Sequence, residues 1–208
     1  MKKIEKIFKI DNKKFNEELQ SVIVKNNLHV DMSAFFETET HLHIKNVADI
    51  ATIIAKEMGL NKEEISVIKQ IAPLHDIGKL LIPAKILTKP AKLTKAEFDV
   101  IKSHANIGYE LLKDCNSKIL QLAALVAIQH HEKYDGTGYP FGLKNREIHL
   151  YSKIITLADV VESLSAERCY KKAWKKEDIK TFIKEQKAKQ FDPTVVAAAL
   201  KQFNKFFN

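Results

Sequence analysis

The sequence contains very little cysteine. Its 208 residues include only Cys115 and Cys169, and the two do not form a CxxC pair. This excludes a disulfide framework and a zinc site with thiolate ligands at finger-like spacing. We therefore expect a protein of a reducing compartment, the cytoplasm.

Long apolar runs are also missing. No stretch approaches the ~20 apolar residues of a membrane span. The basic start of the chain, MKKIEKIFKIDNKKF, lacks the apolar core of a signal peptide. The sequence has no repeat, no low-complexity tract and no linker rich in Ser, Pro or Gly. It therefore predicts a globular protein without a membrane partner.

Arginine is scarce although the chain is basic. The net charge is +8, but Arg146 and Arg168 are the only arginines, and the lysines are scattered along the chain. Scattered lysines are typical of a solvated surface rather than of a site for polymeric nucleic acid. A small anionic substrate is compatible with this charge.

The pattern that is present almost throughout is helical. In residues 43–60, apolar side chains fall on one stripe, and Gly59 supplies a C-terminal stop. The next helix begins with Asn61 as N-cap and Glu64 three residues later, which is a capping box. Its expected apolar face carries Ile65, Ile68, Ala72 and His75.

Further helix starts are marked along the chain. Thr94 and Glu97 repeat the capping box, and Asp192 followed by Pro193 is typical of a helix N-terminus. No alternating run is long enough to build a sheet. The sequence therefore predicts an all-α bundle, with one or two lead-in helices in residues 1–34 around Phe15, Leu19, Val22 and Val24.

The histidines and two aspartates are harder to explain as ordinary core residues. His130 and His131 are adjacent, and adjacent side chains on a helix point about 100° apart, so one apolar face cannot use both. His75 is followed directly by Asp76 at the end of an apolar helix. Asp159 lies in an apolar helix, where an unpaired carboxylate is expensive to bury.

Together these residues indicate a metal centre. Imidazole and carboxylate ligands suit Fe, Mn, Zn or Co, and thiolate is absent from the set. More than four ligands exceed what one tetrahedral zinc ion needs, so at least two ions are expected. The candidates lie at the inner ends or faces of different helices: His43, His75, Asp76, His104, His130, His131 and Asp159.

Two motifs carry a resemblance to a known family. HDIGK at 75–79 and HHEKYDGTGYP at 130–140 resemble the HD-GYP family of cyclic dinucleotide phosphodiesterases, a branch of the HD phosphohydrolases. The resemblance extends over residues 39–200. It implies an all-α HD-domain helical bundle that holds a metal centre between its helices. On this basis we expect a short helical N-terminal lead-in in residues 1–38 and the phosphodiesterase domain in residues 39–208.

The resemblance also implies which residues bind metal. The family's ligands fall on the seven candidates named above, with Asp76 as the bridging ligand. Glu39 lies four residues before His43 and resembles an additional ligand of family members that hold three metals. The alternative for Glu39 is an acidic residue in the first helical turn, favoured by the helix dipole. We therefore expect two or three divalent ions, with iron or manganese favoured.

Substrate contacts follow from the same resemblance. Asp76 and Lys79 are the expected catalytic residues, and Gly78 is expected to release Lys79 from its helix so that it reaches a phosphate oxygen. The loop residues Gly136, Gly138 and Pro140 are expected to hold Tyr139, a further substrate contact, in a fixed place. The expected substrate contacts are Lys79, Tyr139, Arg168 and Lys171, the last two on one helical face.

The chain departs from the family's pattern at a few positions, none of which is an expected metal ligand. Glu162 replaces a common Asp, and Cys169 replaces a common Pro. Asn46 replaces a basic residue, and Asn145 and His149 replace Gly and Pro. We therefore still expect enzymatic activity, and we expect these changes to affect the preference for one substrate over another.

The predicted function is that of a bacterial second-messenger hydrolase. Two neighbouring cations lower the pKa of a bridging water from 15.7 towards about 7, and the resulting hydroxide attacks phosphorus. By resemblance the substrate is cyclic di-GMP, hydrolysed to linear pGpG and/or GMP. The alternatives are a cyclic GMP-AMP phosphodiesterase and a receptor that binds the dinucleotide without turnover. The sequence leaves open whether a separate partner protein regulates the enzyme.

Overall fold

The structure is a computed structural model that describes residues 12–25, 41–167 and 172–207. Within these ranges it contains helices and two isolated β-bridges but no strand. The prediction of an all-α fold is confirmed. No helix in the described ranges is long and apolar enough to cross a membrane.

The helices pack as one bundle around a common core. The α-helices are α1 (Asn12–Lys25), α3 (His41–Glu57), α4 (Lys62–Ile71), α5 (Ala84–Leu87), α6 (Lys95–Lys102), α7 (His104–Leu112), α8 (Lys118–Gln129), α9 (Leu150–Ser165), α10 (Lys176–Glu185) and α11 (Pro193–Gln202). In the part of the chain that the structure describes, four 3₁₀ helices connect or end them: η1 (Ala72–Leu74), η2 (Ile77–Leu81), η3 (Asn145–Glu147) and η4 (Phe203–Phe207).

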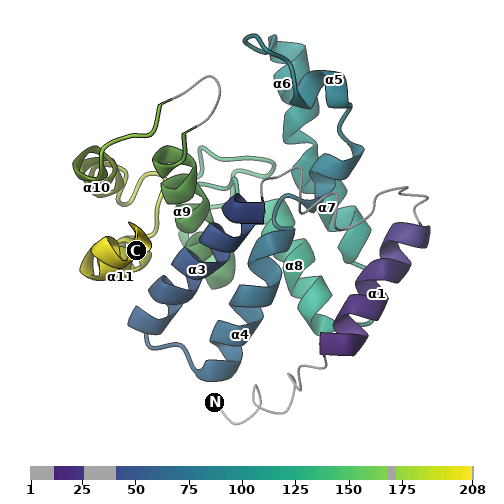
Figure 1. Ribbon diagram of the computed structural model, residues 1–208, viewed down its shortest axis with the longest axis horizontal. Helices are drawn as coiled ribbons and strands as arrows, with labels where there is room; N and C mark the ends of the chain where they lie inside the picture. Colours follow the sequence, from purple (N-terminus) through teal and green to yellow (C-terminus); the bar gives the residue numbers. More distant parts are fainter. Residues whose placement is uncertain (1–11, 26–40, 168–171, 208) are drawn as a thin grey trace.

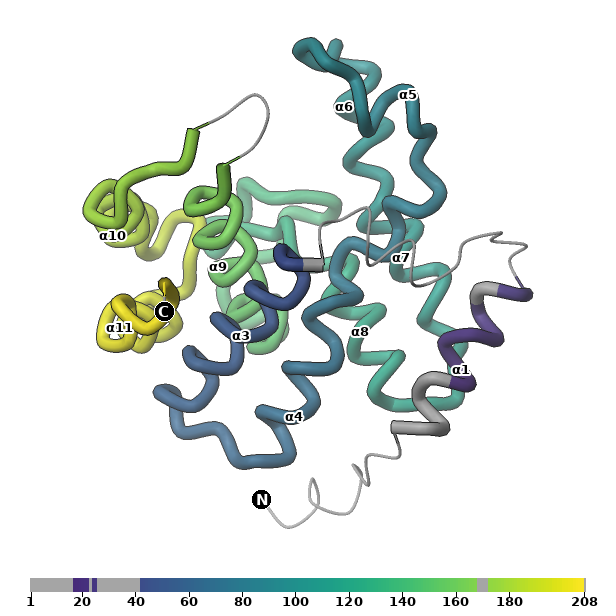
Figure 2. The backbone as a smooth tube through the Cα atoms, viewed as in Figure 1, coloured from purple at the N-terminus to yellow at the C-terminus, as the bar shows by residue number. Residues whose placement is uncertain are grey.

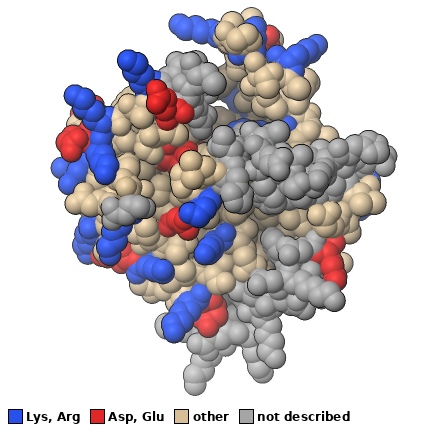
Figure 3. Space-filling view, viewed as in Figure 1, with Lys and Arg blue, Asp and Glu red and all other residues tan. Residues whose placement is uncertain are grey.

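Helix α3 occupies the middle of the bundle (Figure 1). It packs on α9 and α11 on one side and on α4 on the other, and α4 in turn packs on α8. Helix α7 pairs with α8, and α1 contacts the outer side of α8. Helices α5 and α6 project beyond α7 (Figure 2). The surface charge is mixed, since acidic side chains lie among the lysines on the face shown in Figure 3.

The expected apolar stripes form the core. Val47 and Ile54 of α3 are fully buried. Leu19 and Val22 of α1 are buried in the same core, which confirms that this lead-in helix is amphipathic. The prediction for Val24 is wrong, because its side chain is 74% exposed. It lies two residues beyond Val22, on a different side of the helix.

Three expected helix starts are confirmed. The Asn61 side chain accepts the Glu64 N–H at 2.9 Å, and the Glu64 carboxylate accepts the Asn61 N–H at 2.9 Å. Thr94 and Glu97 form the same reciprocal pair at the start of α6. Asp192 caps α11 by accepting backbone N–H groups of its first turn.

The expected helix through His75 is interrupted. Helix α4 ends at Ile71, and the chain continues as the 3₁₀ helix η1, a turn and a second 3₁₀ helix, η2. Pro73 lies in η1 and has no N–H to donate to a continuing α-helix. His75 and Asp76 therefore lie at a turn between two short helices rather than on one helical face.

Candidate metal centre

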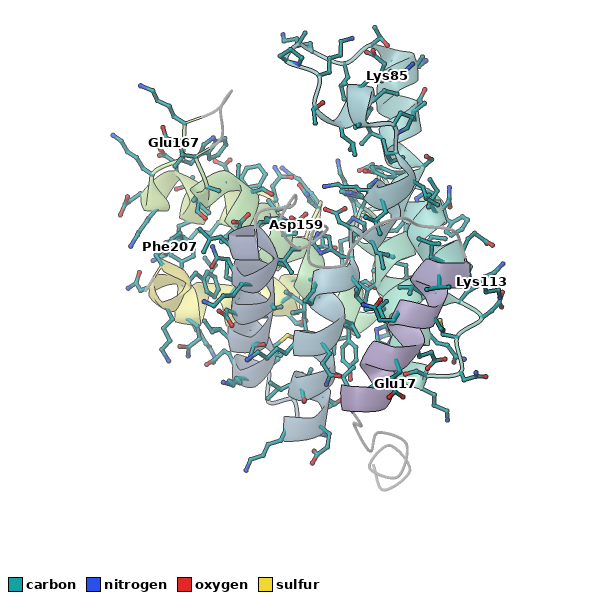
Figure 4. The ribbon with its side chains drawn as sticks, turned by 45° about the vertical axis from the view of Figure 1, so that its right-hand side comes forward. Glu17, Lys85, Lys113, Asp159, Glu167 and Phe207 are labelled. Carbon is teal, nitrogen blue, oxygen red and sulfur yellow. The ribbon has the colours of Figure 1, made fainter. Side chains whose placement is uncertain are left out.

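The predicted ligands come from separate elements that meet at one end of the bundle. His43 lies in the first turn of α3, and His104 is the first residue of α7. His130 is the C-cap of α8. Asp159 lies on α9, beside the N-terminal end of α3 (Figure 4). Helix ends can therefore bring ligands together that are up to 116 residues apart in the sequence.

The structure gathers these residues into two overlapping groups. In each group, the candidate ligand atoms lie within 4.8 Å of one another. The first group is His43, His75 and Asp76; the second is Asp76, His104, His130 and His131. Asp76 belongs to both groups, which is the position that a bridging carboxylate requires.

Asp159 adjoins the first group. Its Oδ1 lies 3.6 Å from His43 Nε2 and 3.9 Å from His75 Nε2. All seven predicted ligands outside Glu39 thus lie at one centre. Their role as ligands remains a prediction that rests on this proximity and on their chemistry.

Hydrogen bonds define the tautomer of three histidines. The Nδ1 atoms of His75, His104 and His130 lie 2.7, 2.6 and 2.8 Å from the backbone carbonyl three residues before each. A carbonyl only accepts, so each Nδ1 carries the hydrogen. In the neutral ring, the lone pair is then on Nε2. The Nε2 atoms of His104 and His130 lie only 3.2 Å apart.

Such an arrangement fits bound cations. Two nitrogen lone pairs at that distance repel each other, and a cation between them replaces the repulsion with two favourable bonds. His75 Nε2 and Asp76 Oδ1 are buried and form no hydrogen bond within the described residues. His75 Nε2 lies 3.1 Å from Asp76 Oδ2, and Asp76 Oδ1 lies 3.2 Å from His104 Nε2, so the neighbours of both atoms belong to the same centre. An unsatisfied buried polar atom costs about 1–3 kcal/mol, and a metal ion at this place would satisfy both atoms.

The protonation states of the centre are shifted by burial and by neighbouring charges. Burial lowers the pKa of His75, but the adjacent Asp76 carboxylate outweighs this effect and raises that pKa to about 9. Burial raises the pKa of Asp76, yet Lys79 and His75 hold it well below its usual range. Burial lowers the pKa of His130 and, together with neighbouring imidazoles, that of His131. Ionised carboxylate and neutral imidazole are the forms that bind metal.

Lys79 reaches the centre as predicted, but Gly78 has a different role from the expected one. Lys79 Nζ lies 2.6 Å from Asp76 Oδ2. Gly78 does not free Lys79 from a helix, because both residues belong to η2. A Cβ atom on Gly78 would lie 1.9 Å from the His104 carbonyl oxygen and 2.6 Å from the Gly108 nitrogen. Gly78 therefore allows the backbones of η2 and α7 to pack in direct contact.

The loop after His131 places Tyr139 against the centre. The Tyr139 ring stacks on the His131 ring, with centroids 4.7 Å apart and an interplanar angle of 24°. Gly136 has a φ of +84°, in the region that favours glycine. A Cβ atom on Gly138 would lie 2.5 Å from the Glu132 Cα atom. The glycines thus permit the tight loop that the sequence predicted.

Glu132 is a residue of this loop to which the sequence assigned no role. Its carboxylate is buried and accepts the N–H groups of Phe141 at 2.8 Å and Leu143 at 3.0 Å. It thereby ties the far end of the loop to the end of α8. Its place inside the HHEKYDGTGYP motif was the available signal.

Comparison with known families identifies the fold. A family model described as the HD domain matches residues 11–195. The chain belongs to the HD domain family. This confirms the resemblance carried by the two motifs. The fold is similar to that of a solved structure from Bdellovibrio bacteriovorus, described as an HDG"Y"P protein, with a TM-score of 0.62 and 19% identity over 78% of this chain and 51% of that one.

Curated relatives match this chain over only part of their own length. The cyclic di-GMP phosphodiesterase response regulator RpfG of Xanthomonas campestris is 42% identical over 81% of this chain and 43% of its own length. The 3′3′-cGAMP-specific phosphodiesterase 2 of Vibrio cholerae is 38% identical over 81% of this chain and 32% of its own length. The chain therefore spans less than half the length of these relatives.

Two of the departures from the family pattern have a structural role in the HD domain. His149 is the N-cap of α9, and its Nδ1 accepts the N–H of Tyr151 at 3.2 Å. Asn145 has a φ of +45°, a left-handed conformation that Gly adopts freely and Asn tolerates. Glu39, Arg168 and Lys171 lie outside the described residues, so their predicted roles remain predictions.

Proposed function

We propose that the chain hydrolyses cyclic di-GMP, to linear pGpG and on to GMP, at a centre of two metal ions. The observation that carries the proposal is the shared position of Asp76 between two groups of buried or partly buried imidazoles. Buried lone pairs that face one another, as in His104 and His130, support cations at this place. The relatives named as cyclic dinucleotide phosphodiesterases support the substrate class.

The donor set supports iron or manganese as the metal. It consists of imidazole and carboxylate without thiolate, which both metals accept. When bound, two such ions supply the Lewis acidity that lowers the pKa of a water towards about 7 and balances charge on the phosphoryl group. A third ion at Glu39 is a further part of the proposal. Metal analysis of wild type and Glu39→Ala tests it, since two ions in both proteins would reject a third site.

The other residues act on the substrate. Lys79, whose amine lies 2.6 Å from Asp76, provides a positive charge beside the centre for a non-bridging phosphoryl oxygen. Tyr139 covers His131 and forms one edge of the substrate site. Arg168 and Lys171 are proposed to hold a base or the second phosphate, because the planar guanidinium of arginine binds bidentately or stacks.

We extend the proposal to the arrangement of the chain, with residues 39–208 as the phosphodiesterase domain and residues 1–38 as a lead-in. Helix α1 of this lead-in contacts α8, the helix that ends at His130. The Glu18 carboxylate accepts the N–H of Ser117 at 3.0 Å, at the N-terminus of α8. The lead-in therefore supports a helix that carries part of the metal centre.

Cyclic GMP-AMP is the second candidate substrate, and the 38% identity to a relative named as specific for it is the observation in its favour. A receptor without turnover is less well supported, because all described ligand positions are filled by metal-binding side chains. The proposed partner is a cyclic dinucleotide, and a cytoplasmic location and a regulatory protein partner remain proposals.

The test is an assay of the metal-loaded protein. Protein stripped by a chelator is loaded with Mn²⁺ or Fe²⁺ and incubated with cyclic di-GMP or 3′3′-cGAMP, and the products are separated by chromatography. We expect hydrolysis of cyclic di-GMP with metal, and none without metal or in Asp76→Asn. Faster turnover of 3′3′-cGAMP would favour the second candidate. Tight binding without any product would favour the receptor.

A further inference from the structure

His43 differs from three other histidines of the metal centre in the partner of its Nδ1 atom. His75, His104 and His130 each direct Nδ1 at a backbone carbonyl three residues earlier. His43 lies in the first turn of α3, which begins at His41, and a backbone carbonyl is not the partner of its Nδ1. Its Nδ1 instead forms a short hydrogen bond with the Glu162 carboxylate of α9.

We propose that Glu162 is a positioning residue that orients His43 for metal binding. This inference rests on the metal centre of the proposed function. A carboxylate accepts, so the hydrogen lies on His43 Nδ1, and the Nε2 lone pair faces the centre. Asp159 Oδ1 lies 3.6 Å from that Nε2 atom. Asp159 and Glu162 are three residues apart on α9, and so share one helical face. Helix α9 thus carries a carboxylate beside each edge of the His43 ring, and the Glu162 carboxylate holds the Nδ1 edge.

The burial of the pair argues that the contact is specific. His43 is 4% exposed and Glu162 is 3% exposed. A buried carboxylate is expensive unless a donor compensates it, and among the described residues the donor to its side chain is the His43 ring. Ion pairs of Glu162 with lysine or arginine are absent from the described part of the chain. The residue is therefore poorly suited to a general stabilising role.

A carboxylate partner also changes the ligand. Hydrogen bonds to an ionised acceptor are roughly twice as strong as those to a neutral carbonyl, so Glu162 holds the His43 ring more firmly than a backbone carbonyl would. Loss of such a partner typically lowers metal affinity by about 10- to 100-fold. The group of His43, His75 and Asp76 is therefore the one whose affinity depends on Glu162. Backbone carbonyls serve the other three rings, and a side-chain substitution does not remove those.

The experiment measures metal affinity without any nucleotide. Chelator-stripped wild type, Glu162→Ala, Glu162→Gln and Glu162→Asp are titrated with Mn²⁺ by calorimetry and by competition with a chelating dye. In Glu162→Ala, we expect one of the two Mn²⁺ affinities to fall about 10- to 100-fold while the other is retained. Glu162→Gln keeps an acceptor but loses the charge, so a smaller fall is expected. Glu162→Asp keeps the charge and should restore most of the affinity.

Asp192→Ala is the matched control. Asp192 is another buried carboxylate, paired with Lys153 at 3.0 Å and capping α11, and none of its recorded partners belongs to the metal centre. We expect it to lower the melting temperature while both Mn²⁺ affinities remain. Equal loss of Mn²⁺ in Asp192→Ala and Glu162→Ala would overturn the inference, as would wild-type affinities in Glu162→Ala. If Glu162→Ala does not fold, the inference would be overturned by wild-type Mn²⁺ affinities in Glu162→Gln, or by an Mn²⁺ affinity in Glu162→Asp that is no higher than in Glu162→Gln.

The outcome is separable from that of the proposed function. A selective loss of Mn²⁺ in Glu162→Ala, in a protein that hydrolyses no cyclic dinucleotide, would support the positioning role and reject the proposed activity. Hydrolysis by a wild type whose Mn²⁺ affinities are insensitive to Glu162 would support the activity and reject the positioning role. A wild type that binds no Mn²⁺ would overturn both.

Discussion

Substitution of Gly78 by alanine tests how closely η2 and α7 must pack to form the centre. The added Cβ would lie 1.9 Å from the His104 carbonyl oxygen, whereas ordinary contacts begin at 3.4 Å. The atoms on the other side of this contact are backbone atoms of α7, which cannot rotate away as a side chain would. Relief therefore requires the two backbones to separate by about 1.5 Å, the difference between 3.4 Å and 1.9 Å.

The expected consequence is a large loss of stability and of metal. Overpacking of a well-packed core typically costs about 1–3 kcal/mol, and a clash between rigid backbones lies at or above the upper end of that range. We expect the free energy of unfolding in urea to fall by ~3 kcal/mol or more. Because Gly78 lies two residues after Asp76 and against His104, the same shift should separate two ligands of one ion and lower the bound metal.

Gly59→Ala is the matched control for this prediction. Gly59 has a φ of +78° and no atom within 4 Å of an added Cβ, so the substitution adds backbone strain without a clash. Its expected cost is about 1–2 kcal/mol, with full metal content retained. A Gly78→Ala protein with wild-type urea stability and full metal content would refute the packing argument.

The remaining predictions concern a ligand, a cap, a thiol and a substrate contact. Asp76→Ala should abolish metal binding and hydrolysis, and normal metal content by elemental analysis would contradict the bridging role. Glu18→Ala removes the acceptor at the start of α8 and should lower the free energy of unfolding by about 1 kcal/mol, or the melting temperature by about 2–4 °C. An unchanged melting temperature would reject this stabilising role of Glu18. Burial raises the pKa of Cys115 to about 11, so in Cys169→Ser protein it should resist alkylation at pH 7 until urea is added. Arg168→Ala should raise KM with metal content unchanged; an unaltered KM would assign it to the surface.

Local sequence signals were sufficient for much of the fold. The caps at Asn61, Thr94 and Asp192 depend on atoms within three residues, so the sequence alone predicts where these helices begin. The apolar period of residues 43–60 predicts the buried face of α3 for the same reason. The prediction was wrong at Val24, because the amphipathic face of a short helix is narrower than its run of apolar residues.

The residues that gather at the candidate metal centre were predictable, because the motifs place imidazole and carboxylate groups at recognisable spacings. The tautomer of each histidine was not predictable from the sequence. The side of each ring that carries the hydrogen depends on which acceptor lies beside Nδ1 after folding. For His75 that acceptor is local, but for His43 it is Glu162, which is 119 residues away in the sequence.

The amino-acid order by itself thus specifies the all-α class, most helix starts and the set of groups that can bind metal, since these follow from contacts within a few residues. The tertiary packing alone decides that Asp76 stands between two groups of imidazoles, that Gly78 lies against the backbone of α7, and that α9 carries a carboxylate beside each edge of the His43 ring. These features depend on distances between helices that are remote in the chain, and no periodicity or motif encodes those distances locally.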